Sequence, residues 1–407
     1  MNDSIHLLGV VVVAGMITTG LGIVAAIAGL GALAIEQQFR RRPGNALAVT
    51  PGEWNLEIYE PHRYLLVGEV EFCNLTERLE IMVPHVEAEA TLLSKGSLEG
   101  ITHQIRVMPK HADAPARPDG YWFGYIVKVG KRTKAELTLE IKGDDLSQLQ
   151  AVWIRIDYVT YGPQGRIPKT RHVVVPLKFP ALDEPDRWRP TAAADVMPIR
   201  THLLTHLDNP VTVVKRYVLP HAQPGDVVTL GESPVAIMQD RFIYPSEIKP
   251  GWLAKRLCYY FMPTSSLATA CGMQTLVNQV GAWRVAGAFL VGAIAKKVFK
   301  KPGVFYQLAG EQARLIDDIT GTLPPYDQFI VLGPDQPQRI VDQIKQETGL
   351  SAAIVDVNDL RAVKVLASTS DVTLEFLTQA LISNPAGNAD EQTPVVLIRP
   401  TDTLRKS

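Results

Sequence analysis

The sequence predicts a multidomain protein with a single N-terminal transmembrane helix, an all-β antiparallel sandwich, and then an α/β domain with a βαβ unit. Three observations predict this fold class: an uncharged apolar stretch near the start, alternating apolar and polar residues in the middle, and a strand–helix–strand pattern near the end. The length of 407 residues suits two or three domains of about 150 residues. The predicted units are the anchor with its basic flank (1–50), the sandwich (51–180), a proline-rich linker (181–198) and the α/β domain (199–407).

The predicted anchor is the stretch Leu7–Ile35, which contains no charged, histidine or amide side chain. A helix needs roughly 20 apolar residues to cross the hydrocarbon core of a bilayer, so this stretch is long enough. A cleaved signal peptide would begin with basic residues, whereas the residues before this stretch include Asp3 and neither lysine nor arginine. We therefore expect a retained membrane anchor.

The flank of this stretch predicts its orientation. Three arginines follow at positions 40–42, and the positive-inside rule keeps such residues on the cytoplasmic side. The expected topology is a single-pass membrane protein with its N-terminus outside and its soluble domains cytoplasmic. Gly15, Gly22 and Gly29 recur every seven residues; they indicate either a contact with a partner transmembrane helix or the ordinary glycine content of such helices.

The sandwich is predicted from strict alternation. Residues 136–141 alternate polar and apolar side chains, and Val152, Ile154, Ile156 and Tyr158 share one face of the next run. About seven short runs of this kind, separated by glycine and proline turns, are typical of an antiparallel sandwich. Its histidines show no metal-ligand spacing. We therefore expect a spacer or docking module in this domain.

The α/β domain is predicted from a strand–helix–strand pattern. Phe329–Leu332 is a buried strand, Ile340, Val341 and Ile344 form the apolar stripe of a helix, and Ala352–Val355 is the second strand. Such a βαβ unit predicts a partly parallel sheet. A further apolar run, Val285–Ala295, is too short to span a bilayer and is predicted to be a buried helix.

Basic residues close that predicted helix, at positions 296, 297, 300 and 301. Lysines at this end complement the helix dipole, and the alternative is that they bind a phosphate or an anionic lipid headgroup. The whole chain has 41 basic and 42 acidic residues, a formal charge of 41 − 42 = −1. This balance argues against a nucleic-acid partner. Three cysteines are too few for a disulfide scaffold or a four-cysteine zinc site.

Two acidic pairs are the candidate metal ligands. Asp317 and Asp318 lie in a loop of small residues, and Asp356 and Asp359 follow the second strand of the βαβ unit. Carboxylates at strand ends can hold Mg²⁺ or Mn²⁺, and ligands bind at the carboxyl edge of open sheets. The alternative is that these residues cap turns, which is their commonest role. No side chain is assigned as catalytic.

Several motifs follow one another between residues 199 and 400: Ile199-Arg200-Thr201-His202-Leu203, Pro224-Gly225-Asp226-Val227-Val228, Glu232-Ser233-Pro234-Val235-Ala236-Ile237, Ile316-Asp317 and Thr393-Pro394-Val395-Val396-Leu397-Ile398-Arg399. In order and spacing they resemble the coenzyme F-420-0:γ-glutamyl ligase family. The arrangement of the whole chain is similar to that of uncharacterised membrane-anchored relatives in cyanobacteria.

The resemblance implies an acid–amino-acid ligase that uses GTP, or ATP, and a divalent metal to join L-glutamate or another amino acid to a small-molecule substrate. It also implies a homodimer. Asp317, with its neighbour Asp318, matches one acidic position of the family, and Asp356 or Asp359 matches a second. Glu232 and Ser233 stand where the family has a nucleotide- or phosphate-binding strand end.

The chain also departs from the family pattern. The family's Ser-Asn after the first acid is replaced by Asp318-Ile319-Thr320. The alternative function is therefore a catalytically inactive relative that acts as a membrane-bound binding or assembly factor. Stabilisation by a nucleotide with Mg²⁺ or Mn²⁺ separates the two hypotheses.

Overall fold

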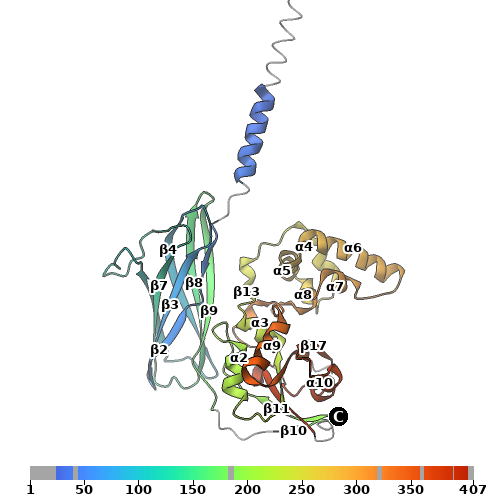
Figure 1. The fold of residues 1–407 in the computed structure, drawn as a ribbon. Helices are drawn as coiled ribbons and strands as arrows, with labels where there is room; N and C mark the ends of the chain where they lie inside the picture. The colour runs from blue at the N-terminus through green and yellow to red at the C-terminus, as the bar shows by residue number, and fades with distance from the viewer. Residues whose placement is uncertain are drawn as a thin grey trace, which may run out of the picture.

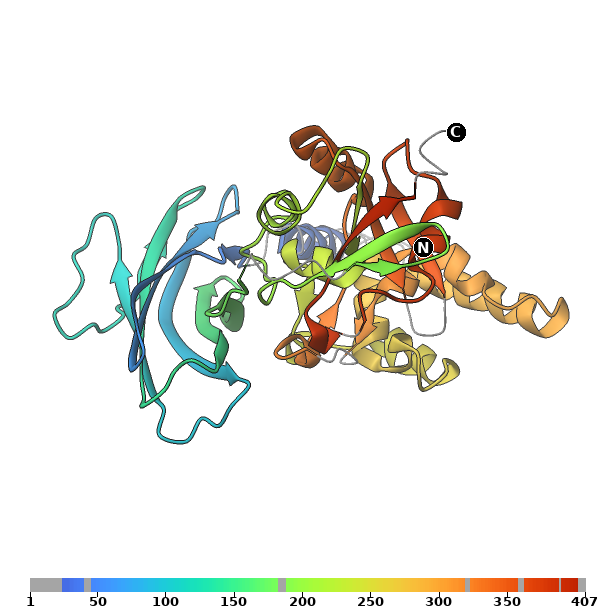
Figure 2. The same cartoon turned by 90° about the horizontal axis from the view of Figure 1, so that it is seen from below.

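The computed structural model describes residues 24–39, 45–181, 188–318, 323–357, 362–387 and 389–401. A helix at residues 24–39 precedes a β-domain and an α/β domain, and a lobe of helices extends from the α/β domain (Figure 1). Seen from below, the β-domain and the α/β domain lie side by side, and the lobe projects away from the β-domain (Figure 2).

The predicted transmembrane helix is wrong for the part of the chain that is described. None of the helices there combines the length and the apolar composition that a bilayer crossing requires. The single-pass location, with an outside N-terminus and cytoplasmic domains, loses its support with that helix. Residues 7–23, with Gly15 and Gly22, lie outside the described residues, so a helix partner through Gly15, Gly22 and Gly29 stays a prediction.

The β-domain is an antiparallel sandwich, as predicted. One sheet has the order β1-β3-β7-β5, with β2 beside β3, and the other has the order β6-β4-β8-β9. The strands are β1 (Leu47–Val49), β2 (Glu53–Glu60), β3 (Arg63–Asn74), β4 (Ile81–Ser94), β5 (Thr102–Lys110), β6 (Tyr125–Val127), β7 (Arg132–Lys142), β8 (Leu149–Gly162) and β9 (Gly165–Pro176). The alternation places Phe72, Leu139 and Ile154 in the core between the sheets.

The α/β domain is built on a six-stranded sheet with the order β10-β11-β18-β12-β16-β17. Its strands are β10 (Arg189–Pro190), β11 (Ala194–Ile199), β12 (Val227–Gly231), β16 (Ser351–Val357), β17 (Val363–Ser368) and β18 (Val395–Pro400). Helices cover both faces of this sheet. Val341 and Ile344 of α9 (Pro337–Thr348) pack with Val228 on one face, and Leu377 of α10 (Leu374–Leu381) packs with Val396 on the other.

The predicted βαβ unit is wrong in its first strand. Among the described strand pairs, β12 with β16 is the parallel one. The strand β15 (Ile330–Val331), which precedes α9, belongs instead to a small sheet with the order β13-β15-β14, where β13 is Phe242–Ile243 and β14 is Asp317–Asp318. The helix α9 itself forms where expected and ends at Gly349, whose φ of 76° lies in the left-handed region.

The remaining elements are short connections and the helical lobe, which comprises residues 249–315. The connections are α2 (Pro210–Val213), η1 (Val214–Val218), α3 (Glu232–Met238), η2 (Pro245–Glu247), η5 (Tyr326–Gln328) and η6 (Ala389–Glu391). The lobe contains α4 (Trp252–Leu257), η3 (Cys258–Tyr260), η4 (Ser266–Ala268), α5 (Ala270–Val280), α6 (Ala282–Val298), α7 (Val304–Ala309) and α8 (Gln312–Leu315). The predicted buried helix at Val285–Ala295 is buried on one face only, since Leu290 and Ile294 of α6 are exposed.

An aromatic cluster joins the β-domain to the α/β domain; we call it the domain interface. Trp153 of β8 and His172 of β9 lie 5.5 and 5.2 Å from the ring of Phe329, measured between ring centroids. Beside this cluster, the Arg171 guanidinium lies 2.8 Å from the Asp240 carboxylate. Apolar burial and a charge pair therefore hold the two domains against each other.

Candidate functional site

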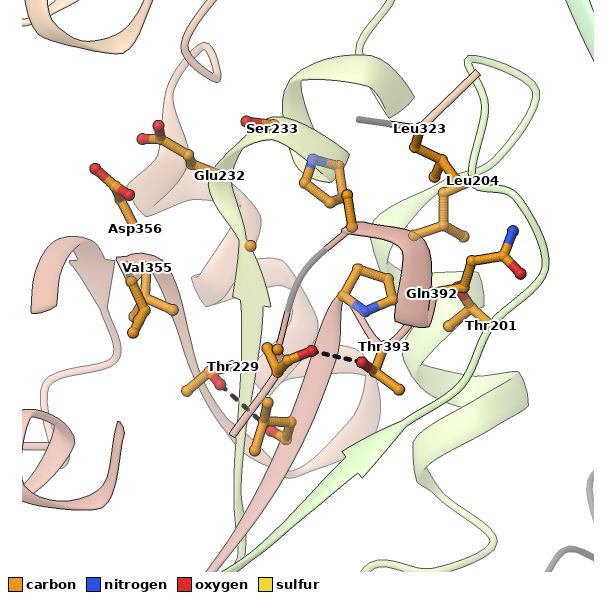
Figure 3. Close-up of a pocket in the computed structure, with 18 of the residues that line it drawn as sticks. Thr201, Leu204, Thr229, Glu232, Ser233, Leu323, Val355, Asp356, Gln392 and Thr393 are labelled. Atoms are coloured by element: carbon orange, nitrogen blue, oxygen red, sulfur yellow. Dashed lines mark hydrogen bonds between the residues drawn. The ribbon is translucent and has the colours of Figure 1, made fainter. Parts of the chain in front are cut away.

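The candidate site is a cavity of about 340 Å³ in the α/β domain. Its position follows from the parallel pairing of β12 and β16, in which Gly231 stands opposite Val355. Because parallel strands end at the same edge of a sheet, the residues that come next, Glu232 and Asp356, both line the cavity. Figure 3 shows these two carboxylates at one end of the pocket.

The small sheet brings a third carboxylate to this end. Asp317 of β14 pairs with Val331 of β15 and lines the same cavity. Ser233, in the first turn of α3, also lines it. The structure thus gathers Glu232, Ser233, Asp317 and Asp356, four of the residues singled out from the sequence.

Two other predicted ligands are not placed by the structure. Asp359 lies outside the described residues, and for Asp318 only the backbone, in β14, is described. Within the described ranges, no group of three or more His, Cys, Asp or Glu side chains is arranged to hold a metal ion. The metal set Asp317, Asp318, Asp356 and Asp359 therefore stays a prediction.

The acidic end of the pocket disfavours full ionisation. The pKa of Glu232 is raised to about 8, first by burial and then by the charges of Asp356 and Asp317, while Lys364 lowers it. Burial also raises the pKa of Asp356, again with Lys364 lowering it and Asp317 raising it. Lys364 stands opposite Asp356 in the pairing of β16 with β17. The carboxylates outnumber this lysine, so a proton or a cation is favoured here.

Glu232 also carries a polar atom without a partner. Its Oε2 is buried and accepts no hydrogen bond from the described residues. A buried carboxylate oxygen in this state costs free energy unless it binds a donor or a cation. This atom is the clearest indication that the acidic end receives a ligand.

The other end of the pocket mixes apolar and polar side chains, and the sequence reasoning missed most of it. Figure 3 shows Leu204 and Leu323 across the pocket from the carboxylates, with Thr201 and Gln392 beside Leu204. The wall is completed by residues 384–387, 389 and 392–394, among which the Thr393 hydroxyl donates a hydrogen bond to the carbonyl of Ala386 at 2.6 Å. The Asn-Pro and Ala-Gly pairs at 384–387 are turn signals that mark such a loop.

The fold and the pocket define a class: an Ig-like β-domain joined to an α/β domain with an acidic site at its strand ends. Residues 48–179 match the family model described as "F420-0:gamma-glutamyl ligase, N-terminal Ig-like domain". This match confirms the resemblance to that ligase family over residues 48–179, which lie outside the C-terminal motifs. It supports a ligase-like protein.

Solved structures give only weak likenesses. The GAE domain of yeast GGA1 has a TM-score of 0.19 and 14% identity, and it aligns over 34% of this chain and 96% of its own. The GAE domain of GGA2p from Saccharomyces cerevisiae has a TM-score of 0.19, 11% identity and coverages of 33% and 98%. A protein from Archaeoglobus fulgidus has a TM-score of 0.17, 13% identity and the same coverages. At these scores the likenesses carry no argument about function. No curated protein sequence matches the chain.

Proposed function

We propose that this protein is an acid–amino-acid ligase whose pocket binds a nucleoside triphosphate with a divalent cation, Mg²⁺ or Mn²⁺. The observation that carries the proposal is the gathering of Glu232, Asp317 and Asp356 at one end of a single cavity, beside two parallel strand ends. GTP is the first nucleotide to test and ATP the second. The amide is formed to L-glutamate or another amino acid.

The chemistry of these side chains suits a hard divalent cation, although the described residues alone do not form a complete set of ligands. Mg²⁺ and Mn²⁺ prefer carboxylate oxygens, and the buried Oε2 of Glu232 accepts no hydrogen bond from described residues. The raised pKa of Glu232 reflects burial and the repulsion of Asp356 and Asp317, which a cation between them would relieve. When bound, the cation would neutralise triphosphate charge and help to activate a substrate carboxyl or phosphate.

The chain's own residues would orient the substrates and limit access of water. Ser233 presents a hydroxyl next to the acidic end, where it can donate a hydrogen bond to a phosphate oxygen. Leu204 and Leu323 lie across the pocket from the carboxylates. These side chains would limit access of water to an acyl phosphate, formed from the substrate carboxylate and the γ-phosphate as the nucleoside diphosphate leaves, until the amino group of the second substrate attacks its carbonyl carbon and releases phosphate.

The test is ligand-dependent thermal stabilisation of the whole chain. GTP or ATP with Mn²⁺ or Mg²⁺ should raise the unfolding temperature, because a ligand that binds only the folded state stabilises it. The variants Asp317→Asn and Asp356→Asn should lose this shift. Asp342→Asn, which changes an exposed carboxylate on α9, is the matched control and should keep it.

The outcomes separate the proposal from its alternative. No shift with either nucleotide and either metal would contradict nucleotide binding. A shift that Asp317→Asn and Asp356→Asn leave intact would remove these residues from the site. Binding without amide formation, when amino acids and candidate acids are supplied, would assign the pocket to a binding protein that does not turn over substrate.

A further inference from the structure

The helical lobe has an extreme local charge. Between positions 249 and 310 there is no aspartate or glutamate, while there are eight basic residues: Lys249, Lys255, Arg256, Arg284, Lys296, Lys297, Lys300 and Lys301. The formal charge of this segment is +8, so the rest of the chain carries −1 − 8 = −9. A near-neutral total therefore hides a strongly basic lobe.

Helix α6 is apolar on two opposite faces. Val285, Ala288 and Gly292 form the buried face, which packs against α7. Trp283, Leu290, Val291, Ile294 and Val298 recur at helical spacing on the other face and are all exposed. Helices of soluble domains that are apolar all round are normally buried all round. Among the described residues, none covers this second face of α6, which its composition predicts to be buried.

More exposed apolar side chains lie next to α6. The ring of Tyr260 in η3 lies 5.2 Å from that of Phe289 of α6, measured between centroids. Trp283 is 92% exposed and Tyr259, beside Tyr260, is 85% exposed. We call the following residues the lobe face: the exposed apolar side chains of α6, the residue Phe299 that follows it, and the lysines near its C-terminus, namely Trp283, Leu290, Val291, Ile294, Lys297, Val298, Phe299, Lys300 and Lys301. Exposed apolar side chains gathered beside basic residues in this way mark an interaction site.

We propose that the lobe face docks onto a lipid bilayer surface that contains anionic headgroups. Aromatic and aliphatic side chains enter the boundary between headgroups and acyl chains, and lysines at the edge reach the phosphates above it. The contact is peripheral: α6 lies along the surface. The inference is independent of the pocket and of the proposed ligase activity.

Two other occupants fit the face less well. A nucleic acid would satisfy the lysines but would leave Leu290, Ile294 and Val298 against a polar backbone. A second copy bound through the same face would bring one +8 segment against another, which is repulsive at moderate ionic strength. An anionic bilayer satisfies the apolar stripe and the charge together.

The test is hydroxyl-radical footprinting of the whole chain with vesicles. Tyr121 of the β-domain, 62% exposed, provides the reference that corrects for radical scavenging by lipid. With vesicles of phosphatidylcholine and phosphatidylglycerol, oxidation of Trp283 should fall at least about threefold relative to Tyr121, and vesicles of phosphatidylcholine alone should have a much smaller effect. Because oxidation is read at Trp283 itself, contacts made elsewhere in the chain do not produce the signal.

Paired variants test the two components of the face. Lys297→Glu with Lys300→Glu should weaken the protection of Trp283 more than about tenfold in lipid concentration, since each basic residue near an anionic surface contributes roughly fivefold. Lys128→Glu with Lys131→Glu, two exposed lysines of the β-domain, is the charge-matched control. Leu290→Ser with Ile294→Ser tests the apolar stripe, and Leu75→Ser is its exposed apolar control.

Three results would overturn the proposal. Trp283 could stay equally oxidised with anionic vesicles, or the control variants could weaken protection as much as the lobe variants. Protection that rises with protein concentration in the absence of lipid would instead assign the face to a second copy of the chain. Thermal unfolding of each variant verifies that the fold is intact.

Discussion

Two apolar surfaces of the described residues differ in burial: the domain interface is covered, and the lobe face is exposed. At the domain interface, Phe329 is 1% exposed among rings from both domains, whereas Leu290 on the lobe face is 62% exposed. Charge distinguishes the two surfaces as well. The interface pairs Arg171 with Asp240 at 2.8 Å, while the lobe segment 249–310 contains eight basic residues and no acid. The covered domain interface therefore has paired charges, whereas the exposed lobe face lies in a segment with an excess of positive charge.

The largest expected difference between the surfaces is in stability. Phe329→Ala should lower the free energy of unfolding by about 3–5 kcal/mol, because it leaves a cavity in a buried aromatic cluster. Leu290→Ala should change it by less than about 0.5 kcal/mol, since that side chain is exposed. Urea titrations followed by circular dichroism measure both. Similar losses for the two variants would mean that the lobe face is covered in solution.

Two glycines of α6, one on the buried face and one on the exposed face, allow the two faces to be compared. A Cβ at Gly292 would lie 3.0 Å from the backbone N of Phe305, whereas at Gly287 nothing lies within 4 Å. Gly292→Ala should therefore destabilise the protein by about 1–3 kcal/mol through overpacking. Gly287→Ala should stabilise it by roughly 0.5–1 kcal/mol through helix propensity. Thermal unfolding of the pair gives the sign of each change, and equal signs would contradict the assignment of faces.

The domain interface should be sensitive to acid. Burial, with a contribution from Arg171, lowers the pKa of His206 to about 3, and its ring lies 5.5 Å from that of Phe242. In the unfolded chain this histidine has a pKa of about 6.5 and binds a proton below that pH. The folded chain does not bind this proton until the pH is near 3, so the free energy of unfolding falls as the pH drops from about 6.5 towards 3. Between pH 7 and pH 5 this single group should cost about 2 kcal/mol.

The variant His206→Met removes the titrating group and so measures its contribution to the pH dependence of stability. The difference in unfolding free energy between wild type and variant should shift by about 2 kcal/mol from pH 7 to pH 5, in favour of the variant at pH 5. Urea titrations at the two pH values measure it. A difference independent of pH would show that His206 is protonated equally in the folded and unfolded states.

The smallest expected effect links the interface to the pocket. Trp153 contacts Phe329, which precedes β15, and β15 pairs with the strand that carries Asp317. Trp153→Leu should therefore weaken binding of GTP with Mn²⁺ by about threefold through the position of Asp317, roughly 0.6 kcal/mol. Isothermal titration measures the affinity. Unchanged affinity would mean that Trp153 contributes to the contact between the domains and not to ligand binding.

Local patterns predicted the β-domain because its strands have one buried and one outer face. The alternation along β7 and β8 follows from that geometry. The same reasoning failed for Val285–Ala295, since an apolar run shows no periodicity that tells a covered face from an exposed one. It also failed for Leu7–Ile35, where apolar composition alone indicated a bilayer crossing that the described helices do not provide.

The pairing of strands that are distant in the sequence could not be predicted from local patterns. Ile330 and Val331 are buried and strand-forming, but nothing local shows that they pair with β13 and β14 and not with β16. The strand parallel to β16 is β12, more than a hundred residues earlier. Asp317 and Asp356 could be chosen as acids near strand ends. Their meeting with Glu232 and the 384–394 loop depends on this pairing, which is a property of the folded chain.

The position of β18 has a consequence for synthesis of the protein. This strand lies between β11 and β12 and pairs with both. While a ribosome is still making the chain, the sheet of the α/β domain consists of two halves with a gap where β18 will insert. The β-domain, whose strands end at Pro176, has all its pairing partners much earlier and can fold while translation continues. The acidic pocket, by contrast, can form only after residue 400 has emerged.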